Sequence, residues 1–462
     1  MNHVSSSAAV DASPALRASA CPSLARIVAA RDGGLCRIRL PGGELHARDA
    51  VAIAQAADLH AAGIVELTSR ANLQLRGVRA GHEAALTAAL TQTGPGTHDH
   101  ADERRNLMTS PLAGRDPHAL DDTGPLAAAL LARLQREPRF AALSPKFALL
   151  LDGGERLMAV DHPHDVWLSA MSSSRHDAGS VRYVIGLAGC PLPVPGSALA
   201  AVAATDIPAF VDALLHTFLD VASPDDMRMR DVLVKHDATV FLQRAAQRAG
   251  IALQTSPAIA AWTRAPAMPE PRIGAHRQRD ARLSHVGGQP ALGRLDTRTL
   301  VALAALASAH GNATLRITPW QSVLVPDIAD DSIPTVLDGL RALGLACEPS
   351  HPYVRLIACA GSTGCSKSAT DTKADARRLA TLLPDAMPDA VVHLSGCERS
   401  CAAAHCAPHT LLAVAPDHYD LYQRADEAST NANRFGIRIA HHLTIEQAAA
   451  LLAPSARSHP DA

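Results

Sequence analysis

The sequence contains a weak internal repeat at an offset of 250 residues, and this repeat restricts the possible fold more than any other feature. Residues 45–78 align with residues 295–328 without a gap, and Thr68 falls opposite Thr318. Each copy predicts a helix followed by two strands that are joined by a short polar turn. A small sheet with one apolar face cannot bury that face alone. We therefore expect the two copies to pair with each other.

The expected elements follow from the apolar periodicity of each copy. In the first copy we predict strands over 35–40, 64–68 and 73–78 and a helix over 45–60. In the second copy Asp296 is expected to cap a helix that runs to about His310, before strands over 314–318 and 322–325. An accidental agreement between two unrelated α/β segments is the alternative, and the sequence alone leaves it open.

Each copy is followed by a longer region that also reads as α/β. We predict strands over 146–151, 166–171 and 181–187 in the first region, and a helix over 369–383 with strands over 391–394, 410–414 and 436–440 in the second. Residues 1–20 and 454–462 are expected to be a disordered lead and a disordered tail. The expected order is therefore half-module, α/β domain, half-module, α/β domain.

Composition excludes several classes of function. The formal net charge of −2 gives no basic excess for binding nucleic acid, and no apolar run reaches the 18 residues that would span a membrane. The first 20 residues lack the charged start and apolar core of a signal peptide. The chain has 9 cysteines, an odd number, which does not favour a disulfide framework. We expect a cytoplasmic protein with reduced thiols.

Four cysteines near the C-terminus form two short pairs, Cys359 with Cys365 and Cys397 with Cys401, spaced C-x5-C and C-x3-C. Thiolates are preferred ligands of iron–sulfur clusters, and two such pairs supply the four that a [4Fe-4S] cluster needs. Four thiolates also suit structural zinc, although zinc pairs usually have other spacings. The spacing favours a cluster and leaves zinc open. The other five cysteines are interpreted as ordinary buried thiols.

Several motifs resemble the sulfite and nitrite reductase superfamily. They are the segment TSRANLQ at 68–74, RNLMTSPLAG at 105–114, SPKF at 144–147 and the two cysteine pairs, in that order. The resemblance implies an α+β fold in which two ferredoxin-like half-domains pair by pseudo-twofold symmetry beside two larger α/β sulfite-reductase-like domains. It also implies a sirohaem that shares a cysteine ligand with a [4Fe-4S] cluster.

This resemblance assigns a character to each part of the chain. The half-domains fall at 21–92 and 283–345, an α/β domain without a cluster at 104–264, a linker at 265–282, and the cluster domain at 350–453.

Within the superfamily the chain is most similar to the precorrin-3B synthases of aerobic cobalamin biosynthesis. The similarity lies in Cys21-Pro22, in residues 67–77 and 110–116, and in Thr318-Pro-Trp320. It implies that precorrin-3A is hydroxylated at C20 with dioxygen while the ring A acetate closes as a γ-lactone. A sirohaem-dependent sulfite or nitrite reductase is the alternative, and there Cys401 would bridge cluster and haem. A non-catalytic electron carrier is a third hypothesis, but carriers need far fewer residues.

A precorrin carries several carboxylates, as sirohaem does, so a pocket that is shaped for one could accept the other. Arginine binds carboxylates through two parallel hydrogen bonds, and lysine acts as a point charge. The candidate substrate-binding residues are Thr68, Arg70, Asn72, Arg76, Arg105 and Lys146. For each charged residue, a surface charge or a structural ion pair is the competing interpretation.

The sequence departs from the reductase pattern at two places. Ala148 stands where sulfite reductases carry a second lysine, and Glu398 and Ser400 change the loop of the second cysteine pair. The resemblance also suggests a separate non-haem iron, whose candidate ligands are His393, His405, His409 and Glu398. No catalytic residue can be assigned. The electron donor is unidentified, and pairing of the half-domains within one chain is compatible with a monomer.

Overall fold

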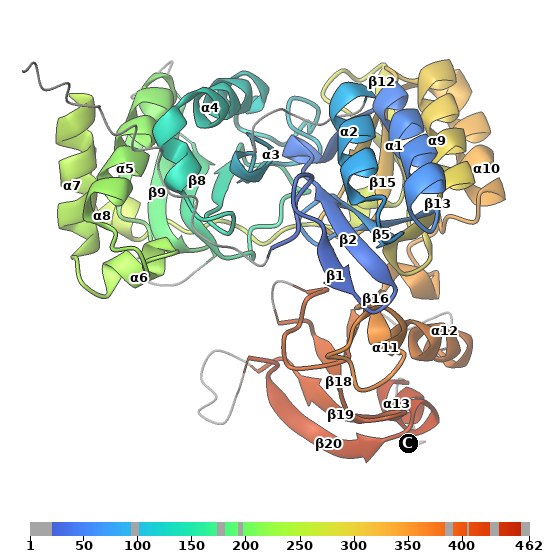
Figure 1. Cartoon of the computed structure of the whole chain (residues 1–462). Coiled ribbons are helices and arrows are strands. Elements are labelled where there is room, and N and C mark those ends of the chain that lie inside the picture. The colour runs from blue at the N-terminus through green and yellow to red at the C-terminus, as the bar shows by residue number, and fades with distance from the viewer. Residues whose placement is uncertain are drawn as a thin grey trace, which may run out of the picture.

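The computed structural model describes residues 21–93, 101–172, 181–192, 197–383, 391–403, 406–425 and 434–453. These residues form four five-stranded sheets with helices packed against them. Figure 1 shows the two half-modules side by side, the first α/β domain next to them, and the cysteine-bearing domain on another side. The predicted lead at 1–20 and tail at 454–462 lie outside the described residues.

The two half-modules contain the same elements in the same order, which confirms the repeat. The first has β1 Val28–Ala30, β2 Gly33–Ile38, β3 Glu44–His46, α1 Ala47–His60, β4 Ile64–Leu67, β5 Leu73–Val78 and α2 Glu83–Thr93. The second has β11 Gly274–Arg277, β12 Leu283–Gly288, β13 Arg294–Asp296, α9 Thr297–His310, β14 Thr314–Ile317, β15 Val323–Ala329 and α10 Ile333–Ala342. The Asp296 side chain caps α9 as predicted, because it accepts a 2.7 Å hydrogen bond from the Thr299 amide.

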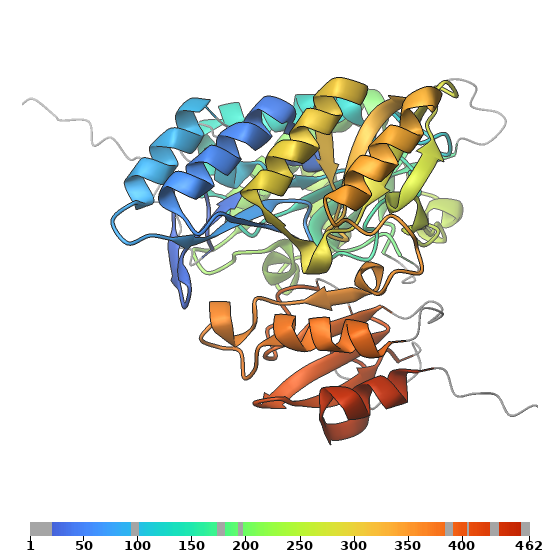
Figure 2. The same cartoon turned by 90° about the vertical axis from the view of Figure 1, so that its right-hand side faces the viewer.

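The half-modules pair by exchanging one strand each. β13 of the second copy adds antiparallel to β4 in the order β1-β2-β5-β4-β13, and β3 of the first copy adds to β14 in the order β11-β12-β15-β14-β3. Leu295 lies opposite Val65, and Leu45 opposite Leu315. Each sheet is thus completed by the other copy. Figure 2 shows α2, α1, α9 and α10 in one row over the two sheets.

The paired half-modules share one hydrophobic core that contains residues of both copies. Replacing the fully buried Leu303 of α9 by Ala is expected to lower the free energy of unfolding by about 2–5 kcal/mol, because it leaves a cavity in this core. Leu59→Ala on α1, where the leucine is 64% exposed, is the matched control. Equilibrium denaturation compares the two variants, and an equal stability would contradict the shared core.

The two α/β domains also share one sheet topology. In the first, β6 Leu107–Met108, β7 Leu149–Asp152 and β8 His164–Met171 are parallel, and β9 Arg182–Gly189 and β10 Ala200–Ala203 follow antiparallel. In the second, β16 Leu356–Ala358, β17 Val392–Ser395 and β18 His409–Ala415 are parallel, and β19 His418–Gln423 and β20 Ile437–Leu443 follow antiparallel. The described chain is therefore a double copy of a half-module followed by an α/β domain.

Helices cover these sheets. The first α/β domain carries α4 Gly124–Arg136, α5 Ile207–Val221, α6 Met229–Leu233, α7 Ala238–Ala249 and α8 Pro257–Ala260, after α3 Ala101–Arg104. The second carries α11 Gly361–Gly364, α12 Thr372–Leu382 and α13 Ile445–Leu452. Among the described residues, no helix is both long and apolar enough to cross a bilayer.

One predicted boundary is wrong. The segment 265–282 is not only a linker, because β11 lies within it and pairs antiparallel with β12 from Gly274 to Arg277. Strand periodicity did not reveal β11, since its sequence GAHR is short and has no large apolar side chain. The second half-module therefore begins at Gly274, before the predicted start at 283.

Candidate functional site

The four C-terminal cysteines lie on two loops at one edge of the last sheet. Cys359 directly follows β16 and Cys397 follows β17, and these neighbouring strands are parallel, so their carboxyl ends meet. Gly361 adopts φ 71°, and the Cys365 amide then donates to the Gly361 carbonyl at 2.8 Å. The Gly396 amide donates to the Cys359 sulfur at 3.3 Å. This hydrogen bond ties the two cysteine loops, 359–365 and 396–401, together.

The four thiols are close enough to influence one another. Burial raises the pKa of the Cys401 thiol, and the neighbouring Cys397, Cys359 and Cys365 raise it further. A group of thiols that disfavours its own ionisation is suited to iron, whose positive charge offsets that of the thiolates. No three His, Cys, Asp or Glu side chains converge on a single ion within the described ranges. A [4Fe-4S] cluster does not require such convergence, because each thiolate binds a different iron. The donor set therefore fits a cluster.

The first α/β domain has an equivalent edge without cysteines. Within the two sheets Leu107 pairs with Leu149 and Ile357 pairs with His393. We take these two pairs as equivalent, because residues 107 and 357 keep the 250-residue offset of the half-modules. Carried along the loops without gaps, this alignment places four non-cysteine residues opposite Cys359, Cys365, Cys397 and Cys401, namely Thr109, Arg115, Gly153 and Leu157.

Apolar side chains fill the part of this second edge around Leu157. Leu157 packs with Leu112 and Leu324 in a small buried cluster, against which Trp320 is also packed. Of two edges with the same strand order, only the C-terminal one carries thiol ligands.

A group of arginines, which we call the basic pocket, lies beside the first half-module, and the turn 68–72 positions one of them. The Thr68 hydroxyl accepts hydrogen bonds from the amides of Arg70 at 3.3 Å and Asn72 at 3.0 Å. The Asn72 side-chain oxygen accepts from the Leu40 amide at 2.8 Å, and Ala71 takes a left-handed φ of 55°. Thr68 and Asn72 are thus bonded to backbone amides, and they hold the turn that presents Arg70.

Arg70 is half-buried among other arginines. Burial, together with the cations of Arg228, Arg37 and Arg39, lowers the pKa of its guanidinium to about 10, and Asp165 opposes this shift. The same environment affects His164, where burial and the cations of Arg70 and Arg228 lower the pKa to about 3. We define the basic pocket by Arg37, Arg39, Arg70 and Arg228. A concentration of cations around one buried guanidinium suits a ligand with several carboxylates.

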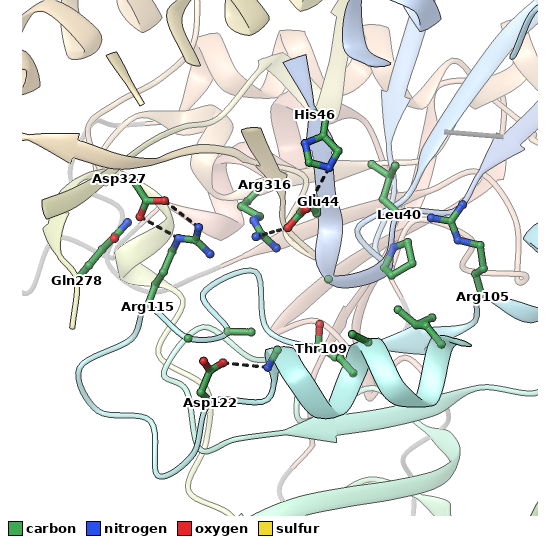
Figure 3. A pocket seen from close by; sticks show the side chains of 18 of the residues that line it. Leu40, Glu44, His46, Arg105, Thr109, Arg115, Asp122, Gln278, Arg316 and Asp327 are labelled. Atoms are coloured by element: carbon green, nitrogen blue, oxygen red, sulfur yellow. Dashed lines mark hydrogen bonds and ion pairs between the residues drawn. The ribbon is translucent and has the colours of Figure 1, made fainter. Parts of the chain in front are cut away.

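Two more predicted residues border this pocket. An Arg39 Nη2 donates to the Pro145 carbonyl at 3.2 Å, and the Asn106 amide group donates to the Phe147 carbonyl at 2.8 Å. These bonds bring the loops of Arg105 and Lys146 to the basic pocket. The Lys146 side chain is exposed, and Arg105 also lines the end of a neighbouring pocket of about 700 Å³ (Figure 3).

Sequence reasoning missed Arg37, Arg39 and Arg228. Arg37 and Arg39 alternate with apolar residues in the segment Cys36-Arg37-Ile38-Arg39, which places both on one side of an extended segment. That alternation was the available signal. Arg228 lies in another domain and is held through Asp165, which accepts from its Nε at 2.9 Å and which no local pattern identifies.

Arg76 lies apart from the basic pocket, beside the cysteine loops. Its side chain is buried and donates to both Asp32 carboxylate oxygens, at 2.8 and 2.9 Å, and to the Gly364 carbonyl at 2.6 Å. These contacts match the competing interpretation of a structural ion pair. A direct role of Arg76 in substrate binding stays a prediction, and its contacts weigh against it.

The structure describes three of the four candidate ligands of a second iron. His393 is buried on β17, His409 begins β18, and Glu398 is exposed on the cysteine loop. His405 lies outside the described residues. The described residues hold no three-residue ligand group, so a second iron stays a prediction.

Comparison with protein-family models identifies the modules. The nitrite/sulfite reductase ferredoxin-like half domain matches residues 29–93 and 276–343. The nitrite and sulphite reductase 4Fe-4S domain matches residues 100–253. Together these matches cover more than half of the chain. The chain belongs to the sulfite and nitrite reductase superfamily. The superfamily's 4Fe-4S domain model matches the α/β domain that lacks the cysteines, which agrees with the duplication seen in the fold.

Individual relatives of this oxidoreductase superfamily carry different activities. A precorrin-3B synthase of Sinorhizobium sp is 29% identical over 88% of this chain and 83% of that protein. A chloroplastic ferredoxin–nitrite reductase of Zea mays is 27% identical over 81% of the chain and 68% of the relative. A ferredoxin-dependent sulfite reductase of Mycolicibacterium paratuberculosis is also 27% identical, over 80% of the chain and 67% of the relative.

A solved structure supports the superfamily fold directly. NirA of Mycobacterium tuberculosis superposes with a TM-score of 0.75 at 22% identity. The match covers 90% of this chain and 79% of the NirA chain. With the two family matches, this likeness confirms the predicted α+β fold of paired ferredoxin-like half-domains and two larger α/β domains.

Proposed function

We propose that the chain converts precorrin-3A to precorrin-3B with dioxygen, in cobalamin biosynthesis. The basic pocket would bind the substrate carboxylates, and the four C-terminal cysteines would hold a [4Fe-4S] cluster beside it. The observation that carries the proposal is the asymmetry between the two α/β domains. One edge has four thiols, and the equivalent edge has no cysteine at the matching positions and carries the apolar cluster of Leu112, Leu157 and Leu324.

The reaction that we propose is C20 hydroxylation with formation of the ring A γ-lactone. Its overall balance takes one oxygen atom of dioxygen into the product and the other into water, with two electrons and two protons from an external donor. A cluster, when bound, supplies electrons one at a time. The residues of the chain bind and orient the substrate, with Arg70 and its neighbours around the carboxylates. The similarity to a precorrin-3B synthase supports this reaction over others.

A sirohaem-dependent reductase is the second candidate, because nitrite and sulfite reductases are nearly as similar to the chain. Ala148 argues against it. In sulfite reductases a second lysine occupies this position, whereas here the residue is buried and has no charge. The Ala148 amide donates to Asp165 at 2.8 Å, so this position supports the Asp165–Arg228 pair.

Incubation of anaerobically purified protein with precorrin-3A tests the proposal. With a reductant and dioxygen, the product is expected to gain the mass of one oxygen atom, which should come from ¹⁸O₂ when the labelled gas is used. Without dioxygen the substrate should remain unchanged. If the mass of the substrate stays constant under both conditions while the protein retains its iron and sulfide, the proposed reaction is wrong.

A further inference from the structure

A cluster of five charges lies directly behind the cysteine loops, away from the basic pocket, and four of them are buried or half-buried while Asp32 is exposed. Glu66 on β4 is at its centre, with Arg294 of the exchanged strand β13 at 2.7 Å, Lys373 of α12 at 3.7 Å and Arg76 at 3.8 Å. Burial raises the pKa of the Glu66 carboxyl, but the three cations outweigh burial and lower it. With Asp32 on Arg76, three cations face two carboxylates, which leaves one net positive charge.

Two of these cations contact the polypeptide around the cysteines. Arg76 donates to the carbonyl of Gly364, the residue before Cys365, and a side chain at Gly364 would lie within 2.6 Å of the guanidinium. Lys373, only 4% exposed, donates to the Leu292 carbonyl at 3.0 Å. It follows Thr372, whose hydroxyl lies 3.4 Å from the Cys359 sulfur. Arg76 and Lys373 are thus fixed close to two of the four cysteines.

The other half of the molecule has the opposite arrangement. On that side the charges of the exchanged pair are swapped, because the arginine, Arg316, is on β14 and the glutamate, Glu44, is on the exchanged strand β3. Arg115, at the position of Cys365, pairs with Asp327 at 2.8 Å. The space beside Thr109 and Arg115 is the pocket of about 700 Å³ in Figure 3. On the cysteine side, Arg76 and Lys373 are buried instead. Arg316 is also buried on the other side but lines the pocket, whereas Arg76 and Lys373 lie beside the cysteine loops.

We propose that Lys373 and Arg76, neutralised in part by Glu66, are positioning residues that raise the reduction potential of the cluster. This inference rests on the proposed [4Fe-4S] site. Each electron that the cluster accepts adds one negative charge, and a fixed positive charge in a buried site stabilises the reduced form. Burial lowers the pKa of the Lys373 ammonium, whereas Glu66 and Cys359 raise it, so these two neighbours favour its charged form.

Redox titration of the cluster in Lys373→Gln tests this role. The variant removes the net positive charge, and its reduced cluster is expected to lose at least tenfold in stability relative to the oxidised one. For a one-electron couple, this lowers the midpoint potential by about 59 mV. The matched control is Arg377→Gln, which removes one charge from the exposed face of the same helix and should leave the potential unchanged.

A double variant separates charge from structure. Lys373→Gln with Glu66→Gln removes one charge of each sign, restores the net positive charge, and should return the potential towards that of the original protein. Iron and sulfide content are measured for every variant. An original protein without a cluster would overturn the proposed function. Two results with intact clusters would overturn this inference alone. One is that Lys373→Gln keeps the original potential, and the other is that the double variant has the same potential as Lys373→Gln.

Discussion

Cys365→Ser is expected to lose the [4Fe-4S] cluster, with iron falling from the four ions of a cubane towards none and acid-labile sulfide falling with it. The thiolate is the ligand that iron in such clusters prefers, and serine oxygen is a much poorer one. The Cys365 amide is bonded to Gly361, so the backbone fixes this loop and no other cysteine of the described chain can take its place without rearrangement. Iron and sulfide analysis of the anaerobically purified variant measures the loss.

Cys406→Ser is the matched control, because Cys406 belongs to the same domain but not to the two cysteine loops. It should keep both iron and sulfide. Full retention of iron and sulfide in Cys365→Ser, or an equal loss in Cys406→Ser, would show that the four-cysteine assignment is wrong.

Arg70→Gln is expected to weaken binding of a carboxylated tetrapyrrole about 10- to 100-fold. A hydrogen bond between charged groups contributes about 1.5–3 kcal/mol, and the substitution removes the guanidinium around which the other cations of the basic pocket gather. The same substitution relieves repulsion from Arg37, Arg39 and Arg228, so the protein should fold at least as stably as before. Fluorescence titration with precorrin-3A, together with a thermal melt, separates affinity from stability.

Arg48→Gln on α1, where the arginine is 84% exposed, provides the control for a simple change of net charge. It should bind the tetrapyrrole as the original protein does. Equal affinities of Arg70→Gln and Arg48→Gln for the tetrapyrrole would show that Arg70 does not bind it.

The sequence predicted the modules but not how they interlock. The repeat at residues 45–78 and 295–328 located both half-modules, because helix and strand periods are local properties of the chain. The exchange of β3 and β13 could not be predicted, since each strand has three residues and its partner lies in the other copy. The sequence likewise did not predict β19, which runs from His418 to Gln423.

The candidate site was predicted in part for the same physical reason. Cysteine spacing identified the two loops, because each pair is close in sequence. The sequence placed an α/β domain after each half-module but did not show which of their residues correspond, since Thr109 and Leu157 share no chemistry with Cys359 and Cys401. Arg76 was grouped with Arg70 because both stand in one motif. Their turn and strand carry them to different surroundings, one to the basic pocket and one to the cysteine loops.

Central to our proposal is that the basic pocket receives a tetrapyrrole substrate and that the protein holds no resident sirohaem. The visible spectrum of the anaerobically purified protein tests this claim most directly. Our account predicts the broad absorption of a [4Fe-4S] cluster that bleaches on reduction, without a Soret band. A strong Soret band from a stoichiometric sirohaem would contradict it and identify the chain as a reductase.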